Sequence, residues 1–142
     1  MYAILLLVHS WLRWAVLAAA LFALARGGSR DERAGKWFTS LLDLQITIGL
    51  VLYFILSPVT RAALEDFGGA MKTSQLRFFA VEHVFGMVVA AALAHIGRAR
   101  VRKASDDRKG RTATIFYGLA LLAILASIPW PGLPAGRPLF RF

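Results

Sequence analysis

A few ionisable side chains stand inside long apolar runs of this chain. His9 and Arg13 lie in the first run, and Glu82 and His83 lie in the third. An ionisable group in a membrane-length apolar helix is costly, and by default it faces protein rather than lipid. Imidazole nitrogens bind haem iron, whereas a carboxylate or a guanidinium binds a polar head group or another charged side chain. We therefore expect the function to be carried out next to His83.

The two histidines are expected at one height in the bilayer. The run 76–97 covers about 33 Å at about 1.5 Å per residue, enough to cross the hydrocarbon core. His9 lies seven residues after Tyr2, and His83 lies seven residues after Leu76, which is about 10 Å into each helix. The first and third spans of an alternating bundle run in the same direction, so both imidazoles share one level.

This arrangement suits a haem b whose iron takes one imidazole from each of two facing helices. His9 and His83 would bind the iron, and Arg13 and Arg77 would provide positive charge for the propionates. Small residues recur beside the second ligand at positions i, i+3, i+7 and i+11: His83, Gly86, Ala90 and Ala94. Such a stripe lets a flat ligand or a neighbouring helix approach closely, so Gly86 is expected beside the cofactor.

Other roles for these polar residues stay open. Glu82 lies about 7 Å nearer the membrane surface than Arg13, so the two side chains could neutralise each other. His9 with Glu82, or His83 with Arg13, could form hydrogen-bonded pairs that only hold the bundle together. A further alternative is that Glu82 and His83 bind a quinone head group and handle its proton.

His95 is expected to have a separate role. It lies twelve residues after His83, a rotation of about 120° along a helix, so the two rings face different directions. Asp43 on the second span lies at a similar height to His95. We therefore expect a hydrogen bond between His95 and Asp43, with a second metal or haem site at this pair as the alternative.

The composition is typical of a small membrane protein. The 142 residues are 58% hydrophobic, with a mean hydropathy of +0.59, too apolar for a soluble domain of this size. The chain contains no cysteine, which excludes disulfides, thiolate ligands and haem attached through CxxCH. Dinucleotide-binding, P-loop and zinc-protease motifs are also absent from the sequence, so electron transfer or an accessory role is favoured over catalysis.

Four apolar segments predict an all-α, transmembrane, up-down-up-down four-helix bundle that forms one domain. The spans are expected at about residues 2–25, 37–57, 76–97 and 112–130. Pro58 ends the second span because proline cannot continue a helix. A short interfacial helix is expected within 59–67, and the tail after Leu133 is expected to be irregular.

The distribution of Lys and Arg predicts the orientation. The segments 26–36 and 98–111 together hold eleven of these residues, whereas the segment 58–75 and the tail hold four. Because positive loops stay on the cytoplasmic side, both termini are expected outside the cell membrane. The net charge of +9 thus reflects topology, and the predicted partner is the lipid bilayer rather than a nucleic acid.

Four segments of the chain resemble a known family. They are HSWLRW at 9–14, LQITIGLVLYF at 44–54, RFFAVEH at 77–83 and IPWP at 128–131. The chain is similar over nearly its whole length to small four-span bacterial membrane proteins that are often labelled cytochrome b-like, and RFFAVEH is the most specific part. The resemblance implies a multi-pass protein of the bacterial inner membrane, with both termini periplasmic, and a b-type haem.

Three functions follow from these observations. The first is electron transfer through a haem b bound by His9 and His83, with Arg13, Arg77, Glu82 and Gly86 around it. The second is a non-catalytic accessory subunit of a larger respiratory or photosynthetic membrane complex, in which the polar residues only hold the bundle together. The third is quinone binding.

Overall fold

The computed structural model describes residues 1–27 and 32–140, and these residues form helices and connecting segments without any strand. The long helices are α1 (Tyr2–Arg26), α2 (Arg33–Val51), α6 (His83–Lys103) and α7 (Asp106–Ser127). A π-helical turn, η1 (Leu52–Leu56), extends α2, and a second, η2 (Phe78–Glu82), leads into α6. The short helices are α3 (Pro58–Glu65), α4 (Phe67–Lys72) and α5 (Ser74–Arg77). The all-α prediction is confirmed.

Four helical stretches are long and apolar enough to cross a membrane: Tyr2–Arg26, Arg33–Leu56, Ser74–Lys103 and Asp106–Ser127. Their positions coincide with the four predicted spans, but the helices extend beyond the apolar segments. The predicted loop 98–111 is mostly helical, because Arg and Lys are good helix formers and favour the C-terminal end of α6. Asp106 and Asp107 in the first turn of α7 favour its N-terminal end in the same way. Within the other predicted basic loop, residues 28–31 lie outside the described residues.

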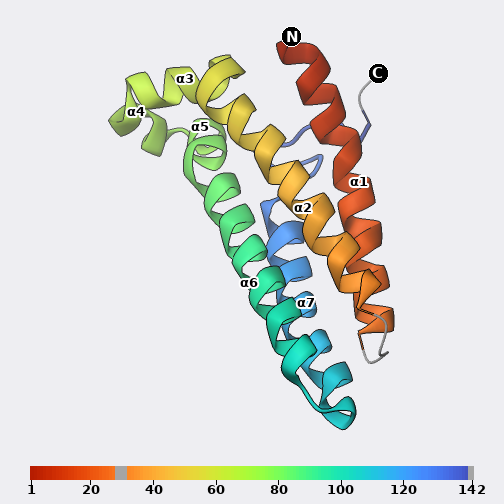
Figure 1. Ribbon diagram of the computed structural model, residues 1–142. Helices are drawn as coiled ribbons and strands as arrows, with labels where there is room; N and C mark the ends of the chain where they lie inside the picture. Colours follow the sequence, from red (N-terminus) through yellow and green to blue (C-terminus); the bar gives the residue numbers. More distant parts are fainter. Residues whose placement is uncertain (28–31, 141–142) are drawn as a thin grey trace.

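The segment between the second and third spans is also helical. Ser57 caps α3 by accepting a hydrogen bond from the Thr60 amide at 3.3 Å, and Pro58 occupies the first turn. Asp66 caps α4 in the same way through the Gly69 amide at 2.9 Å. The short helix expected within 59–67 is therefore confirmed as α3, and it lies at the end of the bundle where α1 begins (Figure 1).

The long helices pack side by side in a fixed pattern (Figure 1). α1 packs against α2 and α7, and α6 packs against α7 and α2, so α1 and α6 are diagonal to each other. We call the end of the bundle with Tyr2, Leu56 and Ser127 the terminus end. The opposite end, with Arg26 and Lys103, is the loop end.

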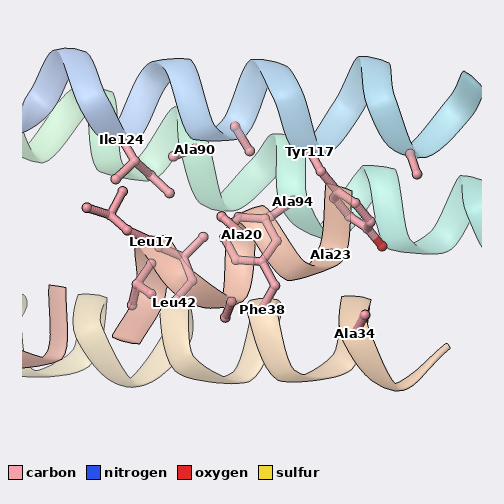
Figure 2. Packing of buried hydrophobic residues seen from close by; sticks show 14 of the residues in the cluster. Leu17, Ala20, Ala23, Ala34, Phe38, Leu42, Ala90, Ala94, Tyr117 and Ile124 are labelled. Atoms are coloured by element: carbon pink, nitrogen blue, oxygen red, sulfur yellow. The ribbon is translucent and has the colours of Figure 1, made fainter. Parts of the chain in front are cut away.

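The core is built on small residues and a few large ones. Phe38 and Leu42 of α2 are fully buried and lie among alanines of the other three long helices (Figure 2). The alanines that are completely inaccessible in this cluster are Ala20, Ala23, Ala90, Ala94, Ala113 and Ala120. Small side chains let membrane helices approach closely, which strengthens their van der Waals contact.

Two glycines of α6, Gly86 in the small-residue stripe and Gly97 beyond it, face α7. A Cβ placed on Gly86 would collide with the Ser127 side chain, and one on Gly97 would lie 2.5 Å from the Cβ of Phe116. Both contacts are made with α7 or its last residue. Gly86 does not line the cavity described below, and its missing side chain is needed for helix packing, so its place beside a cofactor stays a prediction.

The tail folds back over the terminus end without forming a helix. The Arg137 amide donates to the Pro129 carbonyl at 3.0 Å, and the ring of Phe140 stacks on Trp14 with centroids 5.4 Å apart. The guanidinium of Arg13 donates to the Leu139 carbonyl at 2.5 Å. The irregular tail that the sequence predicts is confirmed for the described residues, and these contacts attach it to α1.

Candidate functional site

Two imidazole rings meet across the diagonal of the bundle. The ring centroids of His9 on α1 and His83 on α6 are 6.3 Å apart, and the ring planes are inclined by 72°. The prediction that the two histidines lie at one height is confirmed. The contact joins α1 and α6, one of the two diagonal pairs of long helices.

The tautomer of His83 follows from its hydrogen bond. Its Nδ1 lies 2.7 Å from the backbone carbonyl oxygen of Ser127. A carbonyl can only accept, so a neutral ring donates from Nδ1 and keeps a lone pair on Nε2. This carbonyl is at the C-terminal end of α7, where it has no partner within the helix. His83 is thereby oriented with one nitrogen free to bind a ligand.

The His9 ring packs against α2 at Gly49, which has no side chain. A Cβ on Gly49 would lie 3.1 Å from Cε1 of the His9 ring, so only glycine leaves the ring its present position. Gln45 donates from Nε2 to the backbone carbonyl of His9 at 3.0 Å. Two buried polar atoms at this point, Nδ1 of His9 and Oε1 of Gln45, have no hydrogen-bond partner among residues 1–27 and 32–140. Buried polar atoms of this kind usually have a partner, so they point to a bound ligand or water.

Both π-helical turns lie beside the two histidines. A π turn leaves a backbone carbonyl without its normal helical partner, and here hydroxyl groups take that place. The Tyr53 hydroxyl donates to the Ala80 carbonyl at 2.7 Å, and the Thr60 hydroxyl donates to the Tyr53 carbonyl at 2.7 Å. Tyr53 therefore connects η1 to η2, immediately before His83 in the chain.

A cavity of about 160 Å³ opens beside the rings at the terminus end. It is lined by α1, α2, the start of α6, the end of α7 and the tail. The polar or ionisable side chains in its wall are Tyr2, His9, Ser10, Arg13, Gln45, Tyr53, Ser57, Thr60, His83 and Arg137. Of the residues predicted to bind a cofactor, His9, Arg13 and His83 line this cavity.

Arg77 and Glu82 do not line the cavity but pair with each other. Nε of Arg77 donates to Oε1 of Glu82 at 2.7 Å, and both side chains are about half exposed. The predicted pairing of Glu82 with Arg13 is therefore wrong. A continuous α-helix would place residues five apart at about 140° to each other. The π turn η2 has more residues per turn and brings them to one face.

Arg137 is the cation at the cavity that the sequence reasoning missed. Its guanidinium lies over the ring of Phe79, 5.1 Å from the centroid, and its residue lines the cavity. The signal in the sequence was an arginine inside a short apolar tail, but only the folding back of that tail brings it near His83. Together with Arg13, it makes the wall of the cavity positive at the terminus end.

His95 and Asp43 form the predicted contact away from this site. Nε2 of His95 lies 2.8 Å from Oδ1 of Asp43, and both side chains are about half exposed on the outer surface. The pair links α6 to α2. It shares no residue with the cavity, so His95 is suited as a control for the other two histidines.

The donor set in the cavity fits a haem better than a bare metal ion. No group of three or more His, Cys, Asp or Glu side chains gathers anywhere in the described parts of the chain. Two imidazoles alone leave most positions of a transition metal unfilled, whereas a macrocycle supplies four nitrogens of its own. No protein-family model, curated protein or solved structure matches the chain.

Proposed function

We propose that this chain is an integral membrane electron-transfer protein that binds one haem b between α1 and α6, with His9 and His83 as axial ligands. The distance between the two rings is the observation that carries the proposal. A metal–nitrogen bond of about 2.0 Å and about 1.1 Å from a ring nitrogen to the ring centre place two ligating imidazole centroids about 6 Å apart. The observed distance is 6.3 Å.

The surroundings of the rings support the same proposal. The hydrogen bond from His83 Nδ1 to a backbone carbonyl is the contact that orients histidine ligands and raises their basicity. Arg13 and Arg137 would bind the propionates. A haem with two imidazole ligands supplies a one-electron redox couple. The cavity is smaller than the about 300–1,000 Å³ of ordinary cofactor sites, so flexible side chains such as Met87 would turn aside on binding.

The test is an absorption spectrum of the detergent-solubilised protein expressed with sufficient haem. We expect a reduced-minus-oxidised difference spectrum with Soret and α bands. His9→Ala and His83→Ala should each remove more than about nine-tenths of it, since both axial bonds are needed. His95→Ala is the matched control and should leave the spectrum unchanged. A colourless wild type, or an unchanged spectrum in His83→Ala, would contradict the proposal and favour an accessory subunit.

A second function, binding of a quinone head group, is favoured by the size of the cavity. A cavity of about 150 Å³ holds one benzene ring, and this one has about 160 Å³. The unpartnered Nδ1 of His9 would donate to one oxygen of the head group, and Oε1 of Gln45 would accept from a hydroxyl group of the reduced form, the quinol. A short-chain quinol should then raise the melting temperature of the wild type but not of Gln45→Leu. Equal shifts in both proteins would exclude this function.

We also propose that the loop end is cytoplasmic and the terminus end periplasmic, in a bacterial inner membrane. The excess of Lys and Arg at the loop end supports this orientation. The chain has no cysteine, so a single introduced cysteine reports its own position. Leu133→Cys should react with an impermeant maleimide in intact cells, whereas Arg111→Cys should react only after lysis. If Arg111→Cys reacts in intact cells and Leu133→Cys reacts only after lysis, the orientation is the opposite of the one proposed.

A further inference from the structure

A second, smaller cleft lies at the loop end, between the ends of the four long helices. Its enclosed volume is about 20 Å³. The charged or hydrogen-bonding side chains in its wall are Arg26, Glu32, Arg98, Arg102, Lys109 and Tyr117. None of them lines the cavity beside the histidines, so the two sites are separate.

The charges in this cleft are unbalanced. Among the described residues, four cationic side chains line the cleft beside one carboxylate, that of Glu32. Glu32 is 3.4 Å from Nε of Arg102, a long ion pair, and Lys109 pairs with Asp106 at 3.3 Å. Nε of Arg98 is buried and has no hydrogen-bond partner in the part of the chain that the structure describes. A shielded guanidinium nitrogen without an acceptor is costly, which points to an anion in the cleft.

Tyr117 adds an uncharged donor to the same place. The residue is only 2% exposed, and its ring runs from α7 into the middle of the bundle, edge to face with Phe38 (Figure 2). Its hydroxyl lies over Gly35, where a side chain would collide with it. Among the described residues, this hydroxyl makes no hydrogen bond. Tyr117 lines the cleft, so its hydroxyl is a donor that a ligand in the cleft could use.

We propose that this cleft binds a phosphate oxyanion, provided either by the head group of an anionic phospholipid or by free phosphate. Arginine is the residue best suited to phosphate, because its planar guanidinium donates two parallel hydrogen bonds. Basic pockets between membrane helices on the cytoplasmic side bind anionic head groups. The enclosed part has room for about one oxygen atom, so Arg98 and Tyr117 would hold one phosphate oxygen. The remaining cations would surround the oxygens at the mouth.

The experiment uses the full-length, detergent-solubilised protein and two probes. One is phosphatidylglycerol, counted on the intact protein by native mass spectrometry with phosphatidylcholine as the neutral comparison. The other is inorganic phosphate, followed by the melting temperature. Arg98→Gln removes the guanidinium whose Nε is buried. Arg100→Gln removes the same charge from the same helix, but its guanidinium lies over Phe116, outside the cleft.

We expect Arg98→Gln to weaken binding of the effective probe about tenfold and Tyr117→Phe to weaken it severalfold, since each loses a donor. Arg100→Gln should change it less than about twofold. A response to phosphatidylglycerol alone identifies a lipid head group, and an equal response to inorganic phosphate identifies a free anion. Binding of neither probe, or equal losses in Arg98→Gln and Arg100→Gln, would overturn the proposal. The conservative Tyr117→Phe variant preserves the test if Arg98→Gln fails to fold.

Discussion

The two halves of the bundle are packed in opposite ways. Toward the loop end, α6 and α7 are in contact through Gly97, and alanines fill the space around Phe38. Toward the terminus end, both π turns, an open cavity and several polar atoms without partners surround His9 and His83. The first half gains stability from close packing. The second half gives up part of that packing, which is the usual condition for binding a ligand.

The largest expected effect lies in the closely packed half. Phe38→Ala should lower the free energy of unfolding by about 3–5 kcal/mol, because it empties a fully buried site. Phe54→Ala is the matched control, since Phe54 is 70% exposed, and it should cost less than about 0.5 kcal/mol. Unfolding by SDS in mixed micelles, followed by circular dichroism, measures both. Equal losses would show that the two halves do not differ.

A smaller loss is expected when the helix contact itself is overfilled. Gly97→Ala should cost about 1–3 kcal/mol, because the new Cβ meets the Cβ of Phe116, which cannot rotate away. Gly118→Ala adds the same methyl group to α7, where the nearest atom is 3.9 Å away, and should be neutral or slightly stabilising. The same SDS titration compares them. A neutral Gly97→Ala would mean that α6 and α7 can separate without cost.

The hydrogen bond between the π turns should contribute less again. Tyr53→Phe removes the hydroxyl that donates to the Ala80 carbonyl and should cost about 1–2 kcal/mol. Tyr2→Phe is the control, since Tyr2 also lines the cavity and its hydroxyl makes no hydrogen bond to the described residues. In hydrogen–deuterium exchange, Tyr53→Phe should expose the amides of 78–83 faster than the wild type. Unchanged exchange there would remove Tyr53 as the link to His83.

The smallest effect on stability should accompany a clear effect on the site. Gly49→Ala should change the free energy of unfolding by less than about 1 kcal/mol, because alanine favours helix while the His9 ring shifts by a few tenths of an ångström. That shift should reduce the haem content of the purified protein severalfold, measured by the haem-to-protein absorbance ratio. Gly118→Ala serves again as the control. Full haem content in Gly49→Ala would show that the position of His9 is not restricted by α2.

Much of the fold follows from local properties of the sequence. The four spans, the equal heights of His9 and His83 and the contact of His95 with Asp43 were all predicted. The helix ends were less accurate, because the basic residues of 98–111 continue the helices beyond the apolar segments. The pairing of Glu82 with Arg13 was predicted incorrectly, because Glu82 pairs with Arg77 and Arg13 donates to the Leu139 carbonyl.

The sequence by itself determined the height of each polar residue along the bundle. The tertiary structure decided the direction in which its side chain points. Height grows by a constant rise per residue, so counting from the ends of an apolar run places His9 and His83 at one level. The direction of a side chain around its helix depends on features that the number of residues from the end of the run does not reveal. The π turns change the side of the helix on which nearby residues lie. Gly86 is in contact with α7, and the folding of the tail brings Arg137 to the cavity. These contacts form only when distant parts of the chain meet.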